Sequence, residues 1–174
     1  SEWDRAGREI PVAVNLSARN LMESSFVEYI AGLLDEYQVH PCLLELEITE
    51  SAMIEDPIKA NQMLEQLAGL GLQIAVDDFG TGYTSMAQLE RMPLRTLKID
   101  RSFVSRVPED AASAKILTAM VSLAEVLGAT VVIEGVESET QLRVVQQAGH
   151  CEVQGFLYSP AVIPELYLEM LRTQ

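Results

Sequence analysis

Cysteine and histidine are scarce in this sequence, with two of each among 174 residues. Cys42 and Cys151 lie far apart and have neither CxxC spacing nor neighbouring metal-binding side chains, so we expect two reduced, buried thiols, as is usual in a cytoplasmic setting. His40 and His150 fall in predicted surface loops. No Ser–His–Asp or Cys–His arrangement is evident, which excludes hydrolases of the serine and thiol types.

Positive charge and long apolar runs are scarce as well. The chain has 12 Lys and Arg against 26 Asp and Glu, a net charge of −14. Nucleic acid is therefore excluded as a partner, since binding a phosphate backbone needs a basic face. No apolar run approaches the ~20 residues of a membrane span, and no signal-peptide pattern opens the chain. We expect a cytoplasmic domain with no membrane segment, although its parent protein could be membrane-anchored.

What the chain does contain is a regular alternation of strand and helix patterns. A hydrophobic content of 48% indicates a folded core, and the length suits one domain. Strands are predicted at 12–17, 43–50, 74–78, 96–100, 130–137 and 152–157. Helices are predicted at about 22–38, 57–69 (or to 71, since either Gly69 or Gly71 can end it), 85–91, 116–127, 138–149 and 164–172. Because hairpin signals are lacking, this order predicts serial βα units with a parallel sheet.

Polar side chains follow the apolar run of every predicted strand. They are Asn15, Glu47, Asp77 with Asp78, Lys98, Glu134 and Gln154. The carboxyl ends of parallel strands meet at one rim, which is where βα barrels carry their catalytic groups. The alternative, in which each side chain only caps its own loop, requires six separate coincidences. The pattern therefore predicts a polar site at this rim.

The residue types at the rim favour a divalent cation. One amide and several carboxylates, without His or Cys, form a hard oxygen site suited to Mg²⁺ or Mn²⁺. Neighbouring side chains on a plain strand point to opposite faces, but at a strand end Asp77 and Asp78 can converge on one cation. The alternative for Asp78 is the capping of a turn before Gly80. Lys98 is either a counter-ion or a group that steadies an attacking water and a phosphate.

The order of these residues resembles the EAL domain family of bacterial cyclic di-GMP phosphodiesterases. The matching segments are Val14-Asn-Leu-Ser17, Glu45-Leu-Glu-Ile-Thr-Glu50, Asp77-Asp-Phe-Gly-Thr-Gly-Tyr83, Leu97-Lys-Ile-Asp-Arg-Ser-Phe103, Glu134-Gly-Val-Glu137 and Gln154-Gly-Phe-Leu157. They extend over nearly the whole chain. The resemblance implies a TIM-type (β/α) barrel, a two-metal site for Mg²⁺ or Mn²⁺, and hydrolysis of cyclic di-GMP to linear pGpG.

The resemblance also implies a role for each matching residue. Metal ligands would be Asn15, Glu47, Asp77 and Asp78, of which Asp77 would bridge the two ions. Catalytic and rim residues would be Lys98, which orients water or a phosphate oxygen, Glu134 in the metal and water shell, Gln154 at the water or phosphate, and Glu137. Glu50 would anchor the loop 79–83, which in the family lies near a dimer interface.

Two departures from the family pattern affect the expected fold. The Glu-Ala-Leu strand with its metal-binding Glu is absent, so we expect residues 1–174 to form a partial domain with about six of the eight βα units. The usual basic residue before Pro160 is also absent. A barrel lacking its first two strands has two open edges, so we expect a homodimer or strand-edge association, and impaired activity.

Two other functions compete with this one. A non-catalytic cyclic di-GMP receptor or regulatory module is the main alternative, although the ligand motifs of such proteins usually decay. A metal-dependent lyase or enolising barrel would fit the acidic residues, but not the run from Asp77 to Gly82.

Overall fold

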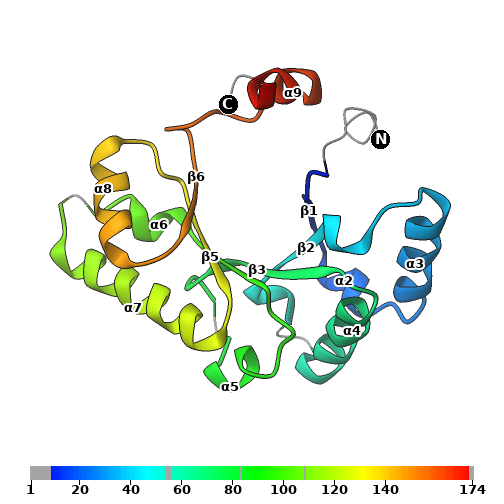
Figure 1. The fold of residues 1–174 in the computed structure, drawn as a ribbon. Helices are drawn as coiled ribbons and strands as arrows, with labels where there is room; N and C mark the ends of the chain where they lie inside the picture. The colour runs from blue at the N-terminus through cyan, green and yellow to red at the C-terminus, as the bar shows by residue number, and fades with distance from the viewer. Residues whose placement is uncertain (1–8, 54–55, 83, 108, 173–174) are drawn as a thin grey trace.

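The fold is a curled parallel sheet with helices on its outer side (Figure 1). The computed structural model describes residues 9–53, 56–82, 84–107 and 109–172. The six strands are β1 (Val12–Asn15), β2 (Leu44–Thr49), β3 (Gln73–Phe79), β4 (Thr96–Ile99), β5 (Thr130–Glu134) and β6 (Glu152–Gln154). Each strand pairs in parallel with the next one along the chain. The predicted α/β class and the incomplete TIM-type barrel of six strands are confirmed.

The predicted helices follow the strands in the predicted order, and two further short helices, at 18–21 and 101–104, were not predicted. The helices are α2 (Ala18–Leu21), α3 (Phe26–Glu36), α4 (Pro57–Gly69), α5 (Met86–Leu89), α6 (Arg101–Val104), α7 (Ala111–Leu127), α8 (Glu139–Ala148) and α9 (Pro164–Arg172), with 3₁₀ helices η1 (Pro41–Leu43) and η2 (Glu50–Met53). Ser138 and Gln141 form a capping box at the start of α8. Asp56 caps α4 by accepting a hydrogen bond from the Lys59 N–H.

Several boundaries differ from the prediction because local turns interrupt an apolar pattern. The helix predicted over 22–38 is wrong at its start: Met22 closes α2, and Ser25 is the N-cap of α3. The strand predicted over 130–137 ends at Glu134, because Gly135 has a φ of 71° and turns the chain out of the sheet. Glu50 belongs to η2 rather than to β2.

The core lies between the outer face of the sheet and the helices. Alternation along the strands directs Ile48, Leu97, Ile99 and Ile133 into this core, where each is 0% exposed. The same alternation directs Glu47, Lys98 and Glu134 to the inner face of the curl. The expectation of two buried cysteines was wrong for Cys42, which is exposed, whereas Cys151 is half-buried.

The curl is open between β1 and β6. Within the described residues each of these strands pairs with one neighbour only, and all four residues of β1 are exposed. The two strands rise on opposite sides of the opening, and α9 lies beyond their ends (Figure 1). A cavity of about 800 Å³ follows the inner face, and its lining includes Ala13, Glu47, Lys98, Gln154 and Tyr167. The structure is therefore a half-barrel whose interior is reached from the open side.

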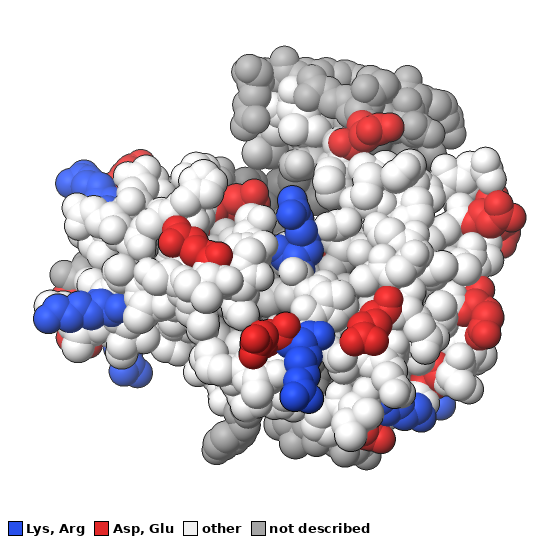
Figure 2. Space-filling model, turned by 60° about the horizontal axis from the view of Figure 1, so that its bottom comes forward, with Lys and Arg blue, Asp and Glu red and all other residues white. Residues whose placement is uncertain are grey.

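On the face shown in Figure 2, Lys and Arg side chains lie apart from one another among acidic and uncharged residues. The described part of this face therefore shows no basic stripe. No helix in the described part of the chain has the length and apolar character needed to cross a membrane.

Candidate metal centre at the carboxyl ends of the strands

The Asp77–Asp78 pair lies at an irregularity in β3. The register between β3 and β4 shifts between Val76 and Phe79, and Asp78 has a φ of 54°, in the left-handed region. The backbone N–H of Asp78 donates to Oδ1 of Asp77 at 3.0 Å. Thr81 donates from its N–H and its hydroxyl to the carbonyl oxygen of Asp78, at 3.2 and 2.8 Å. The local turn thus removes the strict alternation that would separate the two side chains.

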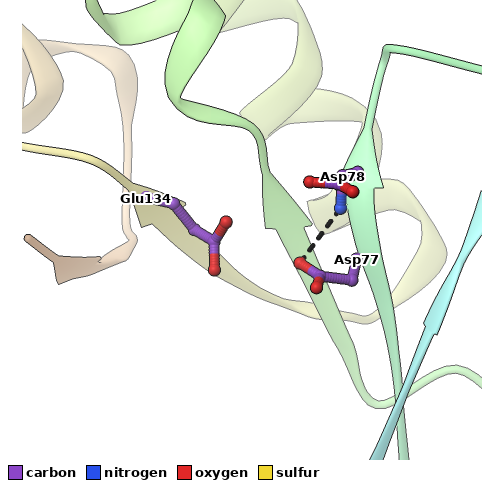
Figure 3. A group of neighbouring side chains, drawn as sticks. All are labelled: Asp77, Asp78 and Glu134. Atoms are coloured by element: carbon purple, nitrogen blue, oxygen red, sulfur yellow. Dashed lines mark hydrogen bonds between the residues drawn. The ribbon is translucent and has the colours of Figure 1, made fainter. Parts of the chain in front are cut away.

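This turn brings three carboxylates together. Asp77, Asp78 and Glu134 each offer an oxygen, and these oxygens lie within 4.8 Å of one another. Figure 3 shows Glu134 pointing from β5 toward the Asp77 side chain, which comes from β3. Oxygen donors of this kind suit hard divalent cations such as Mg²⁺ and Mn²⁺. The predicted convergence of both aspartates on one site is therefore possible in this geometry.

Lys98 lies at the centre of the acidic residues. Its Nζ is 2.7 Å from Oε1 of Glu47, 2.7 Å from Oε1 of Glu134 and 3.3 Å from Oδ1 of Asp77. The residue is 5% exposed. Burial acts to lower the pKa of Lys98, but the hydrogen bonds to Glu134 and Glu47 outweigh it and raise the pKa. Lys98 is therefore a firmly charged ammonium that holds two strand-end glutamates in place.

Two of the acidic residues, Asp78 and Glu134, have raised pKa values. Burial, followed by the charges of Asp77 and Asp100, raises the pKa of Asp78. Burial also raises the pKa of Glu134, although the hydrogen bond and charge of Lys98 act in the opposite direction. Four carboxylates and one ammonium leave a formal charge of −3 at the site. This surplus of negative charge is what a divalent cation would neutralise.

The remaining predicted site residues occupy different places. Asn15 pairs in register with Glu47, and Gln154 pairs with Glu134, so both edge strands direct a side-chain amide toward the acidic rim. Both amides are on exposed residues. Glu137 lies apart from the carboxylate group: its backbone N–H donates to the Gln141 side chain at 2.8 Å, and it lines a separate hollow with Arg101.

Glu50 contacts the loop that follows β3. Its Oε2 accepts a hydrogen bond from the Gly82 N–H at 2.6 Å, and the residue is 3% exposed. Burial raises the pKa of Glu50, while hydrogen bonds from the backbone of Gly82 and Gly80 lower it in part. Glu50 thus joins the end of β2 to the loop after β3, in the place where the sequence predicts an anchor.

Asp100 is a neighbour of the site that was not among the predicted site residues. Its charge acts on Asp78, and its carboxylate also caps α6 by accepting from the Ser102 N–H at 3.0 Å. The spacing was the available signal: Asp100 directly follows β4 with an extended backbone and lies two residues after Lys98, which places both on one face.

The family of the chain follows from a comparison with known proteins. A family model described as the EAL domain matches residues 1–161. The chain belongs to the EAL domain family. The cyclic di-GMP phosphodiesterase NbdA of Pseudomonas aeruginosa is 42% identical over 156 residues, which are 88% of this chain and 20% of NbdA.

Solved EAL structures agree with the fold of this EAL chain. The EAL domain of Mycobacterium smegmatis DcpA superposes with a TM-score of 0.92 at 34% identity, covering 99% of this chain and 78% of that one. The PaMucR phosphodiesterase in its c-di-GMP complex gives a TM-score of 0.89 at 36% identity, covering 95% and 68%. The chain spans between 20% and 25% of the length of the first curated relatives it matches.

Proposed function

We propose that this chain carries the catalytic site of a cyclic di-GMP phosphodiesterase, which hydrolyses one phosphodiester bond to give linear pGpG. The observation that carries the proposal is the group of Asp77, Asp78 and Glu134 around Lys98, at the carboxyl ends of neighbouring strands in an EAL domain. It is supported by relatives that are named cyclic di-GMP phosphodiesterases and by the c-di-GMP complex of PaMucR.

Two Mg²⁺ or Mn²⁺ ions would be held by Asn15, Glu47, Asp77 and Asp78, with Glu134 in the surrounding shell. When bound, such ions polarise a phosphoryl oxygen and lower the pKa of bound water. The oxygen-only donor set and its surplus negative charge fit these ions. An acidic surface would otherwise repel a phosphodiester, so the ions also make binding of the substrate possible.

The side chains around the ions would orient the reactants. Lys98 would direct its ammonium to the water or to a phosphate oxygen while it fixes Glu47 and Glu134. Glu134 has a raised pKa, which suits a group that accepts a proton from the attacking water near neutral pH. Gln154, beside Glu134 in the sheet, would donate its amide N–H to the water or phosphate. Glu137 would act at the rim, outside this group.

The test is the turnover of cyclic di-GMP with Mg²⁺ or Mn²⁺, followed by chromatography of the nucleotide product. Asp77→Asn keeps the side-chain size but removes the charge, so we expect loss of turnover by at least about 100-fold and loss of metal binding. Asp35→Asn makes the same change at an exposed position on α3 and should behave like the unaltered chain.

Two outcomes decide the proposal. Release of pGpG that depends on metal and on Asp77 supports the proposal. Tight binding of cyclic di-GMP without turnover by the complete domain contradicts it and favours the receptor alternative. The impaired turnover expected from the sequence stays a prediction, and the same assay measures it.

A further inference from the structure

The short helix α6 contacts the turn that carries Asp78. A methyl group added at Gly80 would lie 2.6 Å from Cζ and 2.7 Å from Cε2 of Phe103, and 2.8 Å from Cε of Met120 on α7. These separations are far below van der Waals contact, so the Phe103 ring lies directly against the Gly80 backbone. Phe103 itself is partly buried and packs on the main core.

Gly80 belongs to the turn that sets the conformation of Asp78. Its φ is 96°, and the turn is closed by the hydrogen bonds from Thr81 to the carbonyl oxygen of Asp78. Just after Gly80, the Gly82 N–H donates a hydrogen bond to the Glu50 carboxylate. The turn is therefore supported from two sides, by a carboxylate from η2 and by an aromatic ring from α6.

We propose that Phe103 is a positioning residue of the metal site. Its ring, packed against Gly80, fixes the turn in the form that gives Asp78 its left-handed backbone and places the Asp78 carboxylate beside Asp77 and Glu134. Phe103 touches neither metal nor substrate in this role and acts only through the backbone of the turn. The proposal rests on the proposed function, because it assigns Phe103 to the metal site of that function.

The other end of α6 contacts the loop that follows β5. A methyl group at Gly135 would overlap Cβ of Arg101 and lie 3.3 Å from its Cα. Gly135 directly follows Glu134, the third member of the carboxylate group. The single turn of helix α6 therefore contacts both strand-end turns that carry the carboxylates. From this position it can keep constant the separation between the Asp78 and Glu134 carboxylates.

Substitutions at Phe103 test the proposal without the substrate. Phe103→Leu keeps an apolar side chain but lacks the outer ring atoms that contact Gly80, and Phe103→Ala removes the packing altogether. The control is Leu72→Ala. The Leu72 side chain is buried and lies just before the start of β3, at the end of the strand remote from Asp77 and Asp78. We would measure the Kd for Mn²⁺ by electron paramagnetic resonance and the amide hydrogen exchange of residues 78–82.

Groups that orient metal ligands typically change metal affinity 10–100-fold when they are removed. We therefore expect Phe103→Ala to raise the Kd for Mn²⁺ about tenfold or more, with a smaller increase for Phe103→Leu, and both to speed exchange of residues 78–82. Leu72→Ala should lower the Tm while leaving both readouts as in the unaltered chain. If Phe103→Ala does not fold, the folded Phe103→Leu variant decides between these outcomes.

The proposal is overturned if the Phe103 variants match Leu72→Ala in both readouts. It is also overturned if the loop exchanges faster while the Kd is unchanged, since Phe103 would then stabilise the loop without placing a ligand. A chain that binds Mn²⁺ but does not cleave cyclic di-GMP contradicts the proposed function alone. If the unaltered chain binds no Mn²⁺, both the proposed function and the positioning role of Phe103 are overturned.

Discussion

Lys98 shows how one residue organises the candidate site. Its ammonium lies between glutamates from β2 and β5 and an aspartate from β3, so three strand ends meet at a single charge. Removing one partner of a buried ionic group leaves the others uncompensated, which costs more than the pair itself contributes. The two roles considered for Lys98 from sequence, counter-ion and orienting group, are therefore compatible in this geometry.

Lys98→Met should destabilise the metal-free protein by about 3 kcal/mol at pH 7, because the partly buried Glu47 and Glu134 would remain without their cation. Added Mn²⁺ should restore part of this loss, since a bound cation supplies the missing positive charge. Urea denaturation with chelator and with Mn²⁺ measures both effects. Lys115→Met, at an exposed position on α7, is the control and should change little. A Lys98→Met protein as stable as the unaltered chain would rule out this role.

At the scale of elements, the sequence predicted the long strands and helices but not the short segments at the strand ends. The apolar periodicity that identifies α4, α7 and α8 extends over at least ten residues in each. The helices α2 and α6 have four residues each, too few to show a period. The helix α6 nevertheless contacts the turns at Gly80 and Gly135, and its position depends on contacts with these distant segments.

The link between η2 and the loop after β3 gives a prediction with a defined pH dependence. Because burial raises the pKa of Glu50 above its ordinary value of 4.5, the native protein holds this proton more tightly than the unfolded chain does. The stabilisation is fully present below pH 4.5 and is lost as the pH rises through the native pKa. Glu50→Gln keeps an oxygen acceptor for the Gly82 N–H but cannot ionise. The free energy of unfolding of this variant should therefore not fall as the pH rises through the native pKa of Glu50.

Urea denaturation across pH 4 to 7 tests this expectation. The free energy of unfolding of Glu50→Gln should rise relative to the unaltered chain as the pH increases. Glu50→Ala removes the acceptor and should lose about 2 kcal/mol over the whole range. A constant difference between Glu50→Gln and the unaltered chain would show that Glu50 does not titrate as described.

At the scale of the whole molecule, the described part of the sheet has two open edges, at β1 and β6. The backbone N–H of Leu16 donates to the carbonyl oxygen of Glu47 at 2.7 Å, so alternate residues of β1 direct their backbone groups toward β2. The groups of Ala13 and Asn15 therefore face the open edge. Val12 and Val14 are 37% and 46% exposed on the same strand. An exposed apolar edge of this kind is a surface on which further strands can pair.

We accordingly expect the 174-residue chain to associate through its edges. Size-exclusion chromatography with light scattering should give a mass above that of one chain. Ala13→Pro removes an outward N–H without removing a hydrogen bond to β2, so it should shift the protein toward the monomer. Ala13→Ser is the matched control. A stable monomer of the unaltered chain would contradict the prediction of a homodimer or strand-edge association.

The sequence by itself determined the class of fold, the order of the six strands and the residue types at their ends. Apolar periodicity and the Gly, Pro and capping residues that end each element are local properties of the sequence. Only the tertiary structure decided that Asp78 turns back toward Asp77, that Lys98 joins three strands, and that Phe103 supports Gly80. Each of these depends on contacts between segments far apart in the chain, which no local pattern records. The sequence shows Asp77 and Asp78 as adjacent residues, but the positions of their side chains depend on contacts with the other strand ends of the rim.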